Sequence, residues 1–136
     1  MREVFTVFYS WQSDTPQNHG RYLIREALDL AAKKIQKDSM VPYRILVQSD
    51  TENEPGLCNI PETLLKRLRE SDAIVSDMTF IANTDSEVPK RCSNPNVLFE
   101  LGYAFASVGP ERMICVMNEA HGCAAEQIFD LAHHRR

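Results

Sequence analysis

The sequence has few cysteines, and they follow no pairing pattern. Four cysteines stand at irregular spacings with no C-x-x-C pair, which argues against a disulfide framework. The four histidines also lie at no zinc-ligand spacing, so no metal site is predicted. Cys115 falls in an apolar run, where we expect a small core residue rather than a reactive thiol.

The sequence also lacks a strong charge of either sign and a long apolar run. Its formal net charge is −4 and its basic residues are scattered, which disfavours direct binding to nucleic acid or anionic lipid. No apolar run approaches the roughly 20 residues that span a bilayer. The N-terminus leads directly into a strand pattern rather than a signal peptide. These features predict a cytoplasmic protein with no membrane partner.

Three common nucleotide and hydrolase motifs are missing. The chain contains no G-x-x-x-x-G-K-[ST], no G-x-G-x-x-G and no G-x-S-x-G. Their absence disfavours a P-loop ATPase, a dehydrogenase of the dinucleotide-binding fold and an α/β-hydrolase.

The composition that is present is that of one globular domain. Hydrophobic residues make up 43% and charged residues 25% of the 136 positions, and this length suits a single core spanning residues 1–136. Strand and helix patterns alternate along the chain. Strands are predicted at 4–10, 43–48, 73–77 and 112–117. Helices are predicted at 21–37, 60–71 and 94–108, with a short last helix at 126–131 and a long polar loop at 78–93.

This alternation predicts a flavodoxin-like, three-layer α/β/α fold. Its sheet would be mostly parallel with strand order 2-1-3-4, because right-handed crossovers leave few other topologies. In such sheets ligands bind beyond the carboxyl ends of the strands, where the strand order reverses. Here that point lies between the first and third strands.

Polar and aromatic residues gather at this point in the sequence. The candidate substrate-binding residues there are Tyr9, Ser10, Trp11, Ser13, Asp14 and Asp77. Two interpretations stay open for several of them. Asp77 and the serines can instead close turns, and Trp11 can stack on a ligand base or pack on the core as a lid.

Glu100 is the most informative residue of the third helix. The predicted core stripe of that helix comprises Val97, Leu101, Ala104, Phe105 and Val108. This stripe leaves Asn96, Glu100 and Tyr103 along one edge, and Asn96 and Tyr103 are therefore also candidate substrate-binding residues. A capping box does not explain Glu100, because the box position would be Val97 or Phe99. A half-buried carboxylate is costly unless it is paired or used, so we weigh a functional group against a structural ion pair.

A single carboxylate near an apolar wall suits chemistry at an anomeric carbon. Cleavage of an N-glycosidic bond passes through an oxocarbenium-like sugar, which a carboxylate can stabilise or attack. The chain offers no obvious second acid as partner to Glu100. Nicotinamide is a leaving group that needs no second acid, because it departs from a cationic ring and requires no protonation.

Four runs of the sequence together resemble a bacterial branch of TIR-like nucleotide-binding domains. They are also similar to the related nucleoside 2-deoxyribosyltransferase-like group. The runs are FYSWQSD at 8–14, IPE at 60–62, SDAIVSDMT at 71–79 and NPNVLFELGYA at 94–104. The resemblance covers nearly the whole chain, and the last run is its most specific part.

The resemblance implies a flavodoxin-like fold and, as in many relatives, hydrolysis of NAD, often in defence against phage. NAD would be a substrate, with no separate cofactor. The catalytic glutamate of the relatives matches Glu100, and Ser10, Trp11 and Asp77 would line the same pocket. Self-association commonly accompanies activity in such domains. We keep two alternatives: deoxyribosyl transfer or hydrolysis of another nucleoside or nucleotide, and a non-catalytic module for nucleotide sensing or assembly.

Overall fold

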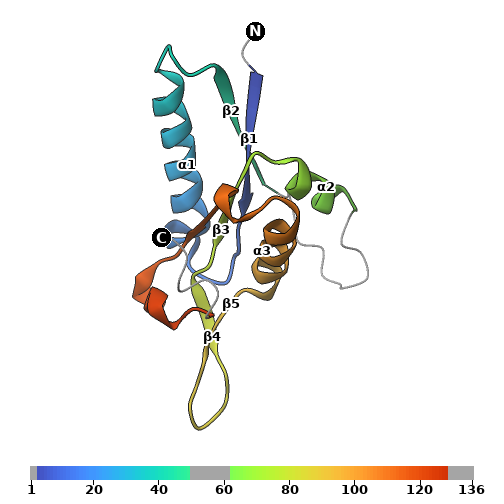
Figure 1. Cartoon of the computed structure of the whole chain (residues 1–136). Coiled ribbons are helices and arrows are strands. Elements are labelled where there is room, and N and C mark those ends of the chain that lie inside the picture. The colour runs from blue at the N-terminus through green and yellow to red at the C-terminus, as the bar shows by residue number, and fades with distance from the viewer. Residues whose placement is uncertain (1–2, 50–61, 129–136) are drawn as a thin grey trace.

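The computed structural model describes residues 3–49 and 62–128, which share one four-stranded parallel sheet (Figure 1). The strands of this sheet are β1 (Glu3–Ser10), β2 (Tyr43–Ser49), β3 (Ala73–Asp77) and β6 (Met113–Val116). Their order across the sheet is β2-β1-β3-β6. The predicted α/β fold and its 2-1-3-4 order are therefore confirmed, with β6 as the fourth strand of the prediction.

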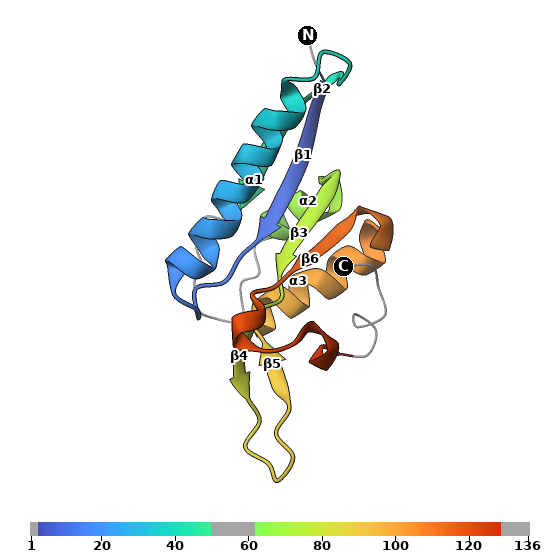
Figure 2. The ribbon, with the colours of Figure 1, turned by 90° about the vertical axis from the view of Figure 1, so that its left-hand side faces the viewer.

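Helices cover both faces of the sheet (Figures 1 and 2). Helix α1 (Arg21–Gln36) packs on one face against β2, and α2 (Glu62–Glu70) packs beside α3 (Pro95–Ser107) on the other. The main core lies under α2 and α3 and consists of Phe8, Leu64, Leu68, Ile74 and Ala104. Burial of these apolar side chains stabilises the packing of the helices on the sheet by about 25 cal/mol for each Å² of apolar surface removed from water.

The strand register brings two strand ends to the same level. Strand β1 pairs in parallel with β3 from Val7↔Ala73 to Ser10↔Ser76, and β3 pairs with β6 from Ile74↔Met113 to Asp77↔Val116. Partner residues in register point to the same face of a sheet. The polar ends of β1 and β3 therefore lie side by side, at the position where the order of the strands reverses.

The predicted long loop at 78–93 is wrong, because most of it forms a β-hairpin. Strands β4 (Phe80–Asn83) and β5 (Arg91–Ser93) pair antiparallel and project beyond the carboxyl end of the main sheet (Figures 1 and 2). The backbone N–H of Thr84 donates to the carbonyl of Lys90 at 2.8 Å and continues the pairing. The strands are too short, and the turn between them too polar, to give an alternating pattern in the sequence.

Burial also departs from the predicted apolar pattern at several positions. Leu23 and Ile35 belong to the apolar residues at helical spacing in α1, yet they are 53% and 46% exposed. Phe105 of α3 is 43% exposed, outside the buried stripe. Cys115 is exposed on β6, which is an edge strand of the sheet. Periodicity marks apolar positions, but it does not tell which of them a neighbouring element covers.

The remaining predicted elements are confirmed within the described residues, except the last. A 3-10 helix at Ala124–Glu126 stands where the last helix was expected to begin, and Gln127 and Ile128 are not helical. The rest of that predicted helix, and the first two residues of the helix predicted at 60–71, lie outside the described residues. No helix in residues 3–49 and 62–128 is long and apolar enough to cross a membrane.

Candidate functional site

The carboxylate of Glu100 meets the end of β1. The hydroxyl of Ser10, the last residue of β1, donates a hydrogen bond to Oε2 of Glu100. Ser10 is 1% exposed, whereas Glu100 is half-buried. The serine thus holds the carboxylate from the protein side. The two residues are 90 positions apart in the chain and meet only because α3 packs over β1 and β3.

The start of α3 is fixed by Asn94 and joined to the loop after β1. The side-chain oxygen of Asn94 accepts hydrogen bonds from the backbone N–H groups of Asn96 and Val97, at 2.8 and 3.2 Å, which makes it the N-cap. Its amide nitrogen donates to the carboxylate of Asp14 at 2.6 Å. One side chain therefore both begins the helix that carries Glu100 and holds Asp14, an exposed residue, next to it.

Asp77 is buried at the end of β3 and ties two loops together. Its side chain is 0% exposed, and one carboxylate oxygen accepts from the backbone N–H of Thr79 at 3.0 Å. The other accepts from Nε2 of Gln12 at 3.3 Å. The oxygen of the same Gln12 side chain accepts from the backbone N–H of Asp14 at 2.5 Å. These contacts agree with the structural interpretation of Asp77, which supports the loop that carries Asp14.

Trp11 carries a cation on one side of its ring. The guanidinium carbon of Arg21 lies 3.6 Å from the centre of the indole ring. A cation stacked this closely on tryptophan contributes about 0.5–1 kcal/mol at an exposed site. Arg21 is the first residue of α1, and Trp11 directly follows Ser10. The stacking therefore places a positive charge beside the loop after β1.

Tyr9 lies under this loop rather than at the surface. It is 1% exposed, and its hydroxyl donates to the backbone carbonyl of Arg21 at 3.2 Å. Burial, with a smaller contribution from the negative charge of Asp77, raises the pKa of Tyr9 far above its usual range. The phenol therefore stays protonated and acts as a donor that holds the start of α1.

The structure brings some predicted site residues together and sets others apart. Ser10 and Glu100 meet directly, and Asp14 is held at the N-terminus of the same helix through Asn94. Tyr103 instead turns toward α2, where its hydroxyl accepts from the guanidinium of Arg69 at 2.8 Å. Ser13 and Asn96 are exposed, the first in the loop after β1 and the second in the first turn of α3.

The residues that sequence reasoning missed are mostly those that connect the site. They are Gln12, Arg21, Asn94 in its bond to Asp14, and Ser76. A polar residue next to a strand end was the available signal for Gln12 and Ser76. No signal in the sequence pairs Arg21 with Trp11, because their contact depends on where α1 begins.

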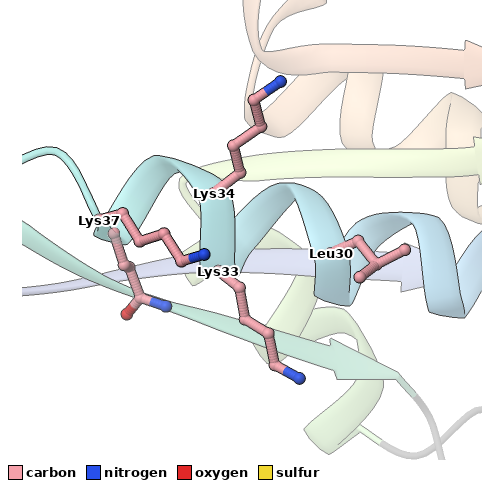
Figure 3. Close-up of a pocket in the computed structure, with 5 residues that line it drawn as sticks. Leu30, Lys33, Lys34 and Lys37 are labelled. Carbon is pink, nitrogen blue, oxygen red and sulfur yellow. The ribbon is translucent and has the colours of Figure 1, made fainter.

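A hollow on the surface lies away from this site. It is lined by Leu30, Lys33, Lys34, Gln36 and Lys37 of α1 (Figure 3). The side chains of Lys33 and Lys34 point in different directions and form no common binding point (Figure 3). At 1.5 Å per helical residue, Lys33 is about 18 Å along α1 from Arg21, so the hollow is at the other end of the helix.

Comparisons of the chain with models of protein families, with curated proteins and with solved structures found no match. In residues 3–49 and 62–128, no three His, Cys, Asp or Glu side chains lie close enough together to hold a metal ion. The site is therefore defined by its own geometry: a half-buried carboxylate, a serine that holds it, and an arginine-covered tryptophan in the adjoining loop.

Proposed function

We propose that this protein is a TIR-like NAD glycohydrolase that cleaves the bond between nicotinamide and ribose, with Glu100 as the catalytic carboxylate. The observation that carries the proposal is the hydrogen bond from Ser10 to Glu100 at the carboxyl ends of β1 and β3. This is where open parallel sheets bind ligands. Glu100 is half-buried there, which suits a group that must meet a substrate.

The reaction needs little more than one well-placed carboxylate. The bond between C1′ of ribose and the ring nitrogen breaks, and its electron pair neutralises the pyridinium charge, so nicotinamide leaves without taking a proton. Positive charge develops on the sugar, and the carboxylate of Glu100 stabilises it. Water then attacks C1′ and releases one proton, which gives ADP-ribose.

The surrounding residues supply binding contacts under this proposal. The guanidinium of Arg21 is a ligand for the phosphates, and the indole of Trp11 is a surface against which a ring of the substrate packs. The exposed carboxylate of Asp14 accepts from ribose hydroxyls. Asp77 acts through Gln12 by holding this loop, rather than by touching the substrate.

The test is nicotinamide release from NAD by the wild type and by Glu100→Gln. We expect the variant to lose at least about 100-fold in kcat, because a neutral amide cannot stabilise the sugar cation. Glu26→Gln, which neutralises an exposed glutamate of α1, is the matched control and should keep wild-type activity. Equal activity in wild type and Glu100→Gln would contradict the role of Glu100. Nucleotide binding without turnover in either protein would favour the sensing module.

A second enzymatic function is favoured by the same hydrogen bond. A carboxylate held by one serine on the protein side is also placed to act as a nucleophile and form a sugar ester. That step would support deoxyribosyl transfer between nucleosides. Mass spectrometry after incubation with a 2-fluoro-2-deoxyribosyl nucleoside decides this point: a stable adduct on the peptide that contains Glu100 supports transfer, and its absence during turnover supports direct hydrolysis.

We also propose that the protein self-associates when active, as the resemblance implies. Specific activity, measured as nicotinamide release per molecule, should then rise with protein concentration and level off once assemblies dominate. Analytical ultracentrifugation over the same concentrations should show a matching rise in mass. Constant specific activity of a monomer across that range would contradict self-association but leave the glycohydrolase proposal in place.

A further inference from the structure

Ser76 carries a buried hydroxyl with no hydrogen-bond partner in the described part of the chain. The residue is 1% exposed, and its Oγ makes no hydrogen bond to any atom of the described residues. Leaving a buried hydroxyl unpaired lowers stability, because the hydrogen bonds that it makes to water in the unfolded chain are not replaced. Folded proteins keep few such groups, and those that persist often serve a function.

The position of Ser76 places this hydroxyl beside Ser10, the serine that donates to Glu100. Ser76 is the register partner of Ser10, so both side chains point to the same face of the sheet. Two residues earlier, the partners Phe8 and Ile74 share a core cluster with Ala104 of α3, which identifies the face. Ser76 therefore faces α3 and stands next to the serine that holds Glu100.

The hydroxyl of Ser10, which donates to Glu100, can also accept a hydrogen bond. Ser10 uses its single proton to donate to Glu100, and a hydroxyl oxygen still has lone pairs that accept. Adjacent strands are about 4.8 Å apart, so two serines in register can hydrogen-bond after a change of side-chain rotamer. The hydroxyl of Ser76 is thus one rotation away from donating to Ser10.

We propose that Ser76 is a positioning residue that completes a relay, Ser76 to Ser10 to Glu100, when the ribose lies against the carboxylate. This inference rests on the proposed function and gives a role to Ser76, a residue to which the resemblance assigns none. Consecutive hydrogen bonds polarise and strengthen one another. The relay fixes the carboxylate as charge develops on the sugar, and it pairs the Ser76 hydroxyl only in that state. An interaction made only then raises kcat rather than substrate affinity.

The test compares Ser76→Ala with Ser71→Ala. Ser71 is also a buried serine, 2% exposed, but its hydroxyl already donates to the carbonyl of Arg67. We expect Ser76→Ala to melt at or above the wild-type temperature, because it removes an unpaired group. Its kcat for nicotinamide release should fall roughly threefold to tenfold with less than a twofold change in KM. Ser71→Ala should melt lower and keep the wild-type kcat.

A second variant keeps the hydroxyl in place. Ser76→Thr retains the donor on a residue type that strands tolerate well, and it should recover most of the kcat lost in Ser76→Ala. Wild-type kcat in Ser76→Ala would overturn the relay while leaving the glycohydrolase proposal standing. A lower melting temperature in Ser76→Ala, with no recovery in Ser76→Thr, would also overturn it. A wild-type protein that releases no nicotinamide would overturn the proposed function, and the relay with it.

Discussion

Tyr9 shows at the scale of one residue how burial near the site affects stability. Its phenol is buried beneath the loop after β1 and donates to the carbonyl of Arg21. Its pKa is raised, first by burial and then by the charge of Asp77, while Arg21 and Arg25 lower it by less. The folded protein therefore binds this proton more tightly than the unfolded chain does, and stability depends on pH in the alkaline range.

We expect the free energy of unfolding to fall as the pH rises above about 10, where a tyrosine of the unfolded chain ionises. Below that pH the contribution of Tyr9 is fully present, and it is lost as the pH rises toward the folded pKa. The slope attributable to this residue is up to about 1.4 kcal/mol per pH unit. Urea denaturation between pH 9 and about 11 should show a shallower decline for Tyr9→Phe.

Tyr43→Phe is the matched control for this measurement. Tyr43 is 39% exposed, and its substitution should leave the alkaline slope of the wild type unchanged. If Tyr9→Phe and the wild type lost stability with the same slope, the buried phenol would not be the group that controls alkaline stability.

Individual residues also show what the sequence could predict about the site. Ser10, Asp14 and Glu100 were predicted from polar residues at strand ends and from one carboxylate on an apolar helix. The structure joins Ser10 to Glu100 and holds Asp14 at the N-terminus of the helix that carries Glu100. Tyr103 was selected by the same helical edge, yet it contacts Arg69. Helical spacing gives the direction of a side chain but not the neighbour it meets, because that depends on how α2 and α3 pack.

At the scale of elements, the N-terminus of α3 and the loop after β1 depend on one amide-carboxylate pair. Asn94 caps the helix with its oxygen and donates to Asp14 with its nitrogen. Asn94→Asp keeps the cap but sets two carboxylates against each other. We expect it to lower the free energy of unfolding by about 1–2 kcal/mol, measured by urea denaturation at pH 7.

The double variant Asn94→Asp/Asp14→Asn reverses the donor and the acceptor. It should recover at least half of the lost stability, because the amide now donates from position 14 to a carboxylate that still caps the helix. Recovery of nothing would mean that Asp14 and Asn94 do not interact in solution.

The base of the β4-β5 hairpin packs against the turn at Gly122. Gly122 has a φ of +146°, and a Cβ placed there would lie 2.6 Å from Phe80 and 2.8 Å from Arg91. Arg91 also pairs with Glu126 at 2.7 Å. We expect Gly122→Ala to destabilise the protein by about 1–3 kcal/mol in thermal or urea unfolding, because both the backbone and the packing oppose it.

Gly102 provides the contrasting glycine. It lies in α3, and an added Cβ would meet nothing within 4 Å. Gly102→Ala should therefore stabilise the protein by up to about 1 kcal/mol through helix propensity. Equal effects at both glycines would contradict the close packing of Gly122 on the hairpin.

The elements differ in how well the sequence predicted them. The four strands of the main sheet and the three helices follow clear apolar periods, and their predicted positions agree with the structure within the described residues. The hairpin was missed because β5 has only three residues, and the turn before it is polar. Its pairing comes from backbone hydrogen bonds and from packing on Gly122, and neither leaves a periodic signal.

At the scale of the whole molecule, the alternation of strands and helices determined the topology. The strand order places β1 and β3 at the centre of the sheet, and the polar ends of both strands then meet at one edge. The topology predicts at which edge of the sheet a ligand binds, but it does not predict which substrate binds there. The assignment to NAD rests on the chemistry of a single carboxylate and on the resemblance to TIR-like domains.

The most direct test of the proposed function is to locate NAD on the Glu100→Gln protein, which the proposal expects to be inactive. Backbone amide NMR shifts, followed during titration with NAD, report where the nucleotide binds without turnover. We predict that the largest changes fall on residues 10–14, on Arg21 and on the first two turns of α3. Changes confined to the lysines of the hollow on α1, or no changes at millimolar NAD, would contradict the placement of the active site at Glu100.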